Sequence, residues 1–222
     1  MFATVEQRIG DLETRVDAMI ARESIRDVLY RYCRAADRCD VELMRSCYHE
    51  DAIDDHGFIS GSGWKFAEYV TAELGQIEAS IHSLSNVLID LDGSRAFSES
   101  QYVAVHRLRT PLGFTDFVHQ GRYLDVWEQR ESIWRISRRV ICRDCDRWHR
   151  AADLEFLSAG KANTPPSGSH SARDPVYLHF GVPRLILERP KAHDLWRSFR
   201  ILAVVPLWFV RAATVLLKPF YR

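Results

Sequence analysis

Residues 81–93, IHSLSNVLIDLDG, mark the point where the hydrophobic period of the chain changes from that of helices to that of strands. Three further segments with strand character follow: RAFSESQYVAVHRLRT (95–110), FTDFVHQGRYLDVWEQR (114–130) and SIWRISRRVICRD (132–144). Turn residues separate these segments at 92–93, 111–113 and 130–132. Four long consecutive strands predict a mainly antiparallel sheet.

Helices are predicted before the strands. A three-four spacing indicates a helix buried on one side, formed by Ile25, Val28, Leu29, Tyr32, Cys33 and Ala36. We expect a shorter helix over 4–19, about two helical turns in VELMRSCYHED (41–51), and another helix in GSGWKFAEYVTAEL (61–74). Helices followed by a meander predict an α+β fold, with the helices on one face of a curved sheet that encloses a cavity.

The chain of 222 residues has room for one domain and an appendage, which we place at 1–150 and 151–222. The appendage begins with a linker rich in Ser, Gly and Pro, SAGKANTPPSGSHSARDP (158–175). Thirty basic and thirty acidic side chains cancel, so nucleic acid is not expected as a partner. Five irregularly spaced cysteines and the absence of a secretory signal favour a cytoplasmic location.

The end of the chain is basic and apolar. Residues 182–222 carry eight Lys and Arg against two acids, and the segment ILAVVPLWFVRAATVLL (201–217) is interrupted by Pro206 and Arg211. Three interpretations are open: the tail packs on its own or a neighbouring subunit, makes peripheral membrane contact, or spans a bilayer. Pro206 and Arg211 favour packing over spanning, and the anchors would be Trp196, Trp208 and Phe209.

Asp37 follows Cys33 by four residues, which places a carboxyl group near the apolar face of the predicted helix. Burial raises the pKa of a carboxyl group, whereas a hydrogen bond from a histidine ring supports its charged form, so a pocket Asp and a pocket His tend to occur together. The alternative is a solvated Asp at a helix end.

Histidines recur on the predicted strands. His82 shares a strand face with Leu84 and Asn86, and His106 shares one with Tyr102. A hairpin brings these two strands together, which favours a lined cavity over isolated histidines bonded to backbone carbonyls. His119 lies on the third strand, whose inward face the alternation does not identify.

Two other patterns are set aside. The C-x-x-C pair Cys142 and Cys145 lies at a strand end without a second pair, so redox or metal chemistry is not favoured. The cluster of His49, Asp54, Asp55 and His56 has no recognised ligand spacing, and a solvated loop explains it equally well. No phosphate loop is present, and we expect neither a metal nor a cofactor.

Four segments resemble the SnoaL-like branch of the nuclear transport factor 2-like (NTF2-like) superfamily. They are LYRYCRAADRCDVELMRSCYHEDA (29–52), IHSLSN (81–86), YVAVHRLR (102–109) and GRYLDVWEQRESIWRISRRV (121–140), and the resemblance spans about residues 15–148. It implies a cone in which three helices cover a curved sheet around a deep apolar pocket. Its enzymes include scytalone dehydratases, bile acid 7α-dehydratases, ketosteroid isomerases, epoxide hydrolases, polyketide cyclases and formaldehyde lyases.

The resemblance implies roles for individual residues. Asp37 matches the aspartate that orients a catalytic histidine, which His82 matches, and His106 and Tyr32 match further catalytic pocket residues. Positions expected to bind substrate are His56, Arg143, Asn86, Tyr102, His119, Tyr48, Phe58 and Trp64. Two departures are seen: Ala36 stands where scytalone dehydratases have a tyrosine, and His56 replaces their second catalytic tyrosine.

These expectations favour a cofactor-independent lyase acting on a hydroxylated aromatic, steroid-like or polyketide-like compound, as in the catabolism of aromatic compounds. The Asp37 and His82 pair would supply general acid and base catalysis for loss of water or of a small carbonyl such as formaldehyde. The alternatives are an isomerase of the ketosteroid type and a non-catalytic module that binds a hydrophobic ligand. The resemblance also implies a homo-oligomer, a trimer or else a dimer.

Overall fold

The computed structural model describes residues 4–111, 113–151, 168–170 and 174–175, all of which belong to the first of two compact units, Met1–Arg184. The tail segment 201–217 and its aromatic anchors lie outside the described residues, as does most of the proposed linker. All five cysteines are free thiols. Within the described part of the chain, the helices are too short or too polar to cross a membrane.

Helix α1 (Val5–Arg38) is continuous, so the expectation of a separate short helix over 4–19 is wrong. No strong helix breaker lies between the two predicted segments, because the single Gly10 is tolerated in a helix of this length. Thr4 and Gln7 form a capping box at its start, and Cys39 ends it in the left-handed conformation with φ of 52°.

Two shorter helices follow, α2 (Val41–Ser46) and α3 (Gly63–Leu74). The side chain of Asp40 caps the first and that of Ser62 caps the second, each accepting a hydrogen bond from a backbone N–H. The predicted helix over 61–74 is confirmed from Gly63 onward, and the two turns predicted within 41–51 are confirmed as α2. Strand β1 begins at Tyr48, where the chain pairs with the sheet, and its exposed and buried residues alternate only from Asp51 to Asp54.

Six strands form one sheet in the order β2-β1-β6-β5-β4-β3. Their bounds are β1 Tyr48–Asp55, β2 Ser60–Ser62, β3 Ala79–Asp92, β4 Arg95–Thr110, β5 Gly113–Arg130 and β6 Ile133–Arg150. The four predicted strands are confirmed as an antiparallel meander, and the strands β1 and β2 were missed. Because β1 runs parallel to β6, the sheet is mixed.

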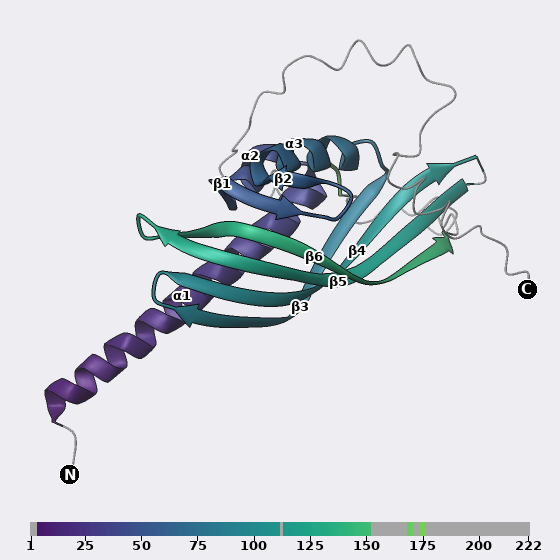
Figure 1. The fold of residues 1–222 in the computed structure, drawn as a ribbon. Helices are drawn as coiled ribbons and strands as arrows, with labels where there is room; N and C mark the ends of the chain where they lie inside the picture. Colours follow the sequence, from purple (N-terminus) through teal and green to yellow (C-terminus); the bar gives the residue numbers. More distant parts are fainter. Residues whose placement is uncertain (1–3, 112, 152–167, 171–173, 176–222) are drawn as a thin grey trace, which may run out of the picture. The chain divides into compact units, whose positions relative to one another are not determined.

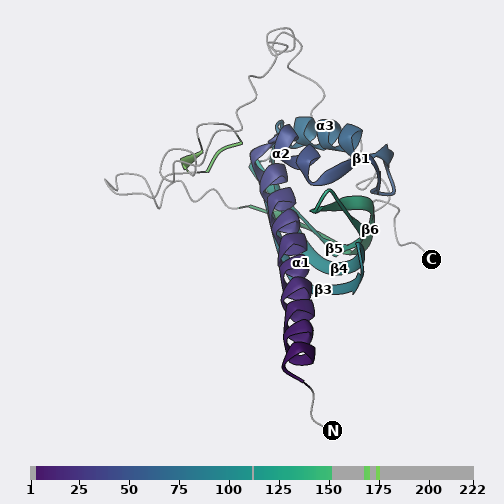
Figure 2. The same ribbon diagram turned by 90° about the vertical axis from the view of Figure 1, so that its left-hand side faces the viewer.

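The sheet curves around the helices, which lie on one of its faces (Figures 1 and 2). Strand β4 shows the expected alternation, since every second side chain from Ala96 to Leu108 is buried. The buried face of α1, which includes Ile25, Leu29 and Tyr32, packs against this inner side. The α+β cone is therefore confirmed, and the end of α1 lies against strand β3.

Candidate active site

The end of α1 holds Asp37 against strand β3. Nδ1 of His82 lies 2.7 Å from Oδ1 of Asp37, and the backbone N–H of His82 donates to Oδ2 at 3.0 Å. Because an ionised carboxylate only accepts hydrogen bonds, Nδ1 carries the proton and Nε2 keeps its lone pair in the neutral ring. The side chains of His82 and Asp37 are 9% and 14% exposed, so the pair is largely withdrawn from water.

Ser80 adds a third group to this pair. Its hydroxyl lies 3.4 Å from Oδ1 of Asp37 and also 3.4 Å from Nδ1 of His82. The backbone N–H of Ser80 in turn donates to Nε2 of His170 at 3.0 Å. A residue from beyond the sheet therefore contacts the strand segment that presents His82.

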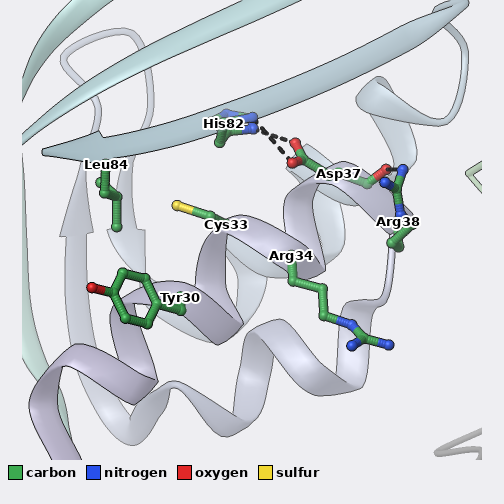
Figure 3. A pocket seen from close by; sticks show the side chains of 7 residues that line it. All are labelled: Tyr30, Cys33, Arg34, Asp37, Arg38, His82 and Leu84. Atoms are coloured by element: carbon green, nitrogen blue, oxygen red, sulfur yellow. Dashed lines mark hydrogen bonds and ion pairs between the residues drawn. The ribbon is translucent and has the colours of Figure 1, made fainter. Parts of the chain in front are cut away.

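A hollow of about 290 Å³ opens beside the pair, between α1 and β3 (Figure 3). Its lining residues are Tyr30, Cys33, Arg34, Asp37, Arg38, His82 and Leu84. Figure 3 shows His82 on the strand facing Asp37 on the helix, with the sulfur of Cys33 directed toward the same space. The hollow is large enough for a small organic molecule and combines an apolar wall with charged groups at one end.

His106 lies next to His82 on the neighbouring strand, with ring centroids 5.5 Å apart. It is buried, and burial lowers its pKa well below the usual value of a histidine, with smaller contributions from His82, His119 and His170. The ring is therefore neutral at neutral pH, which suits a partner in hydrogen bonding better than a fixed cation.

A second carboxylate and histidine pair lies farther along the inner face. Nδ1 of His119 donates to Oδ1 of Asp146 at 2.6 Å, so Nε2 accepts from the hydroxyl of Tyr102 at 2.5 Å. Burial lowers the pKa of His119 and raises that of Tyr102. Arg143 donates to Asp146 at 3.1 Å, although its own side chain is mostly exposed. Three of the expected substrate-binding residues thus form one network.

A third such pair joins β1 to the helices. His56 hydrogen-bonds to Asp54, which also accepts from the hydroxyl of Tyr48 at 2.6 Å. The ring of His56 stacks on Phe66, with centroids 3.9 Å apart. Asp54 is buried, as is His49, so the interpretation of this cluster as a solvated loop is wrong. No group of three metal-ligating side chains occurs in the described ranges.

Other expected site residues lie elsewhere. Asn86 has φ of 48°, is exposed, and donates to Gln101, because an irregularity between Ser85 and Leu88 breaks the strand alternation. The expectation that Asn86 shares the inward face of His82 is therefore wrong. Phe58 is exposed and its ring meets that of His56 edge to face, while Trp64 is half-buried near Arg45.

Tyr32 belongs to the core rather than to the hollow. Its ring packs edge to face on Tyr48 and Tyr123, and the guanidinium of Arg139 lies 4.1 Å from its centroid. Burial raises its pKa, so the hydroxyl stays protonated. Through these contacts Tyr32 packs helix α1 against the inner face of the sheet.

Several residues beside the hollow were not named as site residues from the sequence, namely Tyr30, Cys33, Arg34, Arg38, Ser80 and Leu84. Tyr30, Cys33 and Arg34 precede Asp37 by seven, four and three residues and so share its helix face, a signal that was available. Arg38 also pairs with Asp174 at 3.3 Å. That contact and the one from His170 come from residues far along the sequence, and no local pattern predicts them.

Comparison with known proteins identifies the family and the fold of the chain. Residues 17–140 match the model of the SnoaL-like domain family. A type 2 hexachlorocyclohexane dehydrochlorinase superposes with a TM-score of 0.56 and 17% identity, over 68% of this chain and 98% of that chain. A scytalone dehydratase candidate from Novosphingobium aromaticivorans gives a TM-score of 0.54 and 20% identity, over 66% and 97%.

A third solved structure is a protein of unknown function from Mycobacterium tuberculosis. It has a TM-score of 0.50 and 25% identity, over 58% of this chain and 74% of that chain. A search of curated proteins finds no match. The structural likenesses establish the fold and leave the reaction to be argued from the residues.

Proposed function

Because the chain belongs to the SnoaL-like family of the NTF2-like superfamily, we propose that it is a cofactor-independent lyase in which His82 is the base and Asp37 orients it. The observation that carries the proposal is the pairing of Nδ1 of His82 with Asp37 at 2.7 Å beside the hollow. This contact leaves the lone pair on Nε2 for a substrate proton. A second hydrogen bond, from the His82 backbone, fixes the carboxylate.

In the proposed reaction Nε2 of His82 removes a proton from a carbon next to the one that bears a hydroxyl group. The C–H electron pair forms the double bond as the C–O bond breaks, and the new imidazolium returns the proton to the departing oxygen as water. The carboxylate of Asp37 stabilises the imidazolium between these two transfers. General acid and base catalysis of this kind contributes about 10²–10⁴-fold to a rate.

The same base serves the loss of formaldehyde, in which it removes the hydroxyl proton of a hydroxymethyl group. The O–H electron pair forms the C=O bond of formaldehyde as the C–C bond breaks, and the imidazolium returns the proton to the carbon that keeps the C–C electron pair. Elimination has some support from the neighbouring structures, because one is named a dehydrochlorinase and another a scytalone dehydratase candidate. We propose a hydroxylated aromatic or steroid-like substrate, since the hollow presents the ring of Tyr30 and the apolar side chain of Leu84 along with the pair.

His106 and Tyr102 are proposed to bind substrate oxygens from the inner face, with His119 holding the hydroxyl of Tyr102. His106 lies beside His82, and its neutral ring can donate or accept a hydrogen bond without the cost of a buried charge. An isomerase of the ketosteroid type needs the same base and a donor to an oxyanion, a part that these residues can also play. The lyase releases a product lighter than the substrate, whereas the isomerase leaves the mass unchanged.

The test is a screen of hydroxylated aromatic and steroid-like compounds, with products identified by mass spectrometry. His82→Ala and Asp37→Asn should each lose about 10²-fold or more of the turnover. Matched controls are His149→Ala on β6 and Asp90→Asn on β3, which remove the same groups from exposed positions. A product of unchanged mass indicates the isomerase, and full turnover by His82→Ala would show that the assigned base is wrong.

A further inference from the structure

The first part of α1 extends past the edge of the sheet, as Figures 1 and 2 show from two directions. Besides Ile20, which lies next to them, its large apolar side chains that are between 50% and 70% exposed are Val5, Ile9, Leu12, Val16 and Met19. Their spacing alternates between four and three residues, which places all five on one narrow seam of the helix. Nothing among the described residues covers that seam.

This seam has the pattern of a coiled coil. Ile9 and Val16 occupy the first apolar position of the heptad, and Leu12 occupies the second together with Val5 and Met19. Branched residues at the first position with Leu at the second favour two parallel strands over three or four. The opposite side of the helix carries polar or small residues, which are Gln7, Gly10, Asp11, Thr14 and Asp17.

The charges beside the seam select the orientation of a partner. Arg8, Arg15 and Arg22 line one side, and Glu6 and Glu13 line the other. In a parallel pair of identical helices these two sides meet, so that Arg8 lies against Glu13 of the partner. An antiparallel pair would bring arginine against arginine and glutamate against glutamate. Within a single helix Arg8 and Glu13 are not neighbours, so their charges gain little from each other.

The helix also needs support that its own domain does not give it. Thr4 and Gln7 cap its first turn, with hydrogen bonds in both directions at 2.9 and 3.3 Å. Beyond that cap, residues 5–20 have almost no tertiary packing. Helical segments of this length are marginal in water when isolated, and Gly10 weakens this one further.

We propose that residues 5–22 of two copies of this chain associate as a parallel, two-stranded coiled coil. The occupant of the seam is thus the same segment of a second molecule, matched in shape by its branched residues and in charge by Arg8 and Glu13. The dimer does not depend on the proposed reaction. It joins the chains outside the hollow beside His82, because the buried residues of α1 begin at Ile25.

Sedimentation equilibrium of the full chain tests the dimer. Leu12→Glu places a charge in the seam and should halve the molecular mass relative to the unchanged chain. The control Thr14→Glu adds the same charge on the opposite side of the helix and should leave the mass as it is. Both positions are exposed and outside the folded core, so neither variant should unfold the domain. Equal masses for Leu12→Glu and the unchanged chain would overturn the proposal.

The orientation has its own test. Arg8→Glu and Glu13→Arg should each weaken the dimer, because either change places like charges across the interface. The double variant restores opposite charges and should recover the affinity. Leu12→Cys should in addition yield a disulfide-linked dimer on a non-reducing gel, because identical positions face each other in a parallel pair. A double variant that stays as weak as the single variants would contradict parallel pairing.

Discussion

Arg139 on β6 donates from Nε and Nη2 to the two carboxylate oxygens of Asp125 on β5, at 2.6 and 2.8 Å, and both side chains are completely buried. The rings of Tyr32 and Tyr123 lie 4.1 Å from the guanidinium carbon. This arrangement forms a charged and aromatic layer inside the cone. It supports Tyr32 on α1, the helix that carries Asp37 at its end.

Arg139→Met should lower the free energy of unfolding by about 3–5 kcal/mol, because it leaves the carboxylate of Asp125 buried without its counterion. Urea denaturation measures this change. In the double variant Arg139→Met with Asp125→Leu, no buried charge remains, and most of the loss should be recovered. A single variant that costs less than about 1 kcal/mol would contradict the account of the interior.

Gly121→Ala should destabilise the fold by ~1–3 kcal/mol, because an added Cβ would lie 2.1 Å from the backbone oxygen of Cys142 and 2.9 Å from the hydroxyl of Tyr102. The contact between Tyr102 and His119 should be displaced with it. Gly10→Ala is the control, since nothing lies within 4 Å of its added Cβ. Thermal unfolding should show no loss for Gly10→Ala, and an equal response of the two variants would be evidence against this close approach.

The stability of the protein should fall as the pH drops below about 6.5, the usual pKa of histidine. Burial lowers the pKa of His106 in the folded chain, so between the two pKa values the unfolded chain binds a proton that the folded chain does not. Each such group contributes a slope of about 1.4 kcal/mol per pH unit. His106→Gln should make the fall less steep, whereas His149→Ala, which removes an exposed ring, should not. If the free energy of unfolding fell equally steeply with pH in His106→Gln and in the unchanged protein, this would contradict the burial of a neutral His106.

Substrates that carry a carboxylate or phenolate should depend on Arg34, which lines the hollow together with Arg38. Arg34→Gln should raise KM for such compounds by about tenfold with little change in kcat, because the contact is equal in the ground and transition states. Uncharged analogues should show no difference between the two proteins. Steady-state kinetics with one charged and one uncharged substrate measure both KM changes. Equal KM changes for the two substrates would show that Arg34 does not bind the anionic group.

The four meander strands were predictable because their alternation is long and two of the three turns between them carry Gly, Pro or Asp. Asp37 and His82 were also predictable, from the helix face and from the resemblance. Strand β1 was not, since its short segment is recognised only through its pairing with β6. The outward turn of Asn86 depends on an irregular register, and the contacts of His170 and Asp174 depend on chain folding over long separations.

The measurement that tests the central claim most directly is the tautomer of His82, read by nitrogen NMR of the labelled protein at neutral pH. We predict that Nδ1 carries the proton and Nε2 does not, because Asp37 accepts from Nδ1 at 2.7 Å. Asp37→Asn should remove this preference without unfolding the domain. A proton found on Nε2 in the unchanged protein, with Nδ1 bare, would contradict the assignment of His82 as the base.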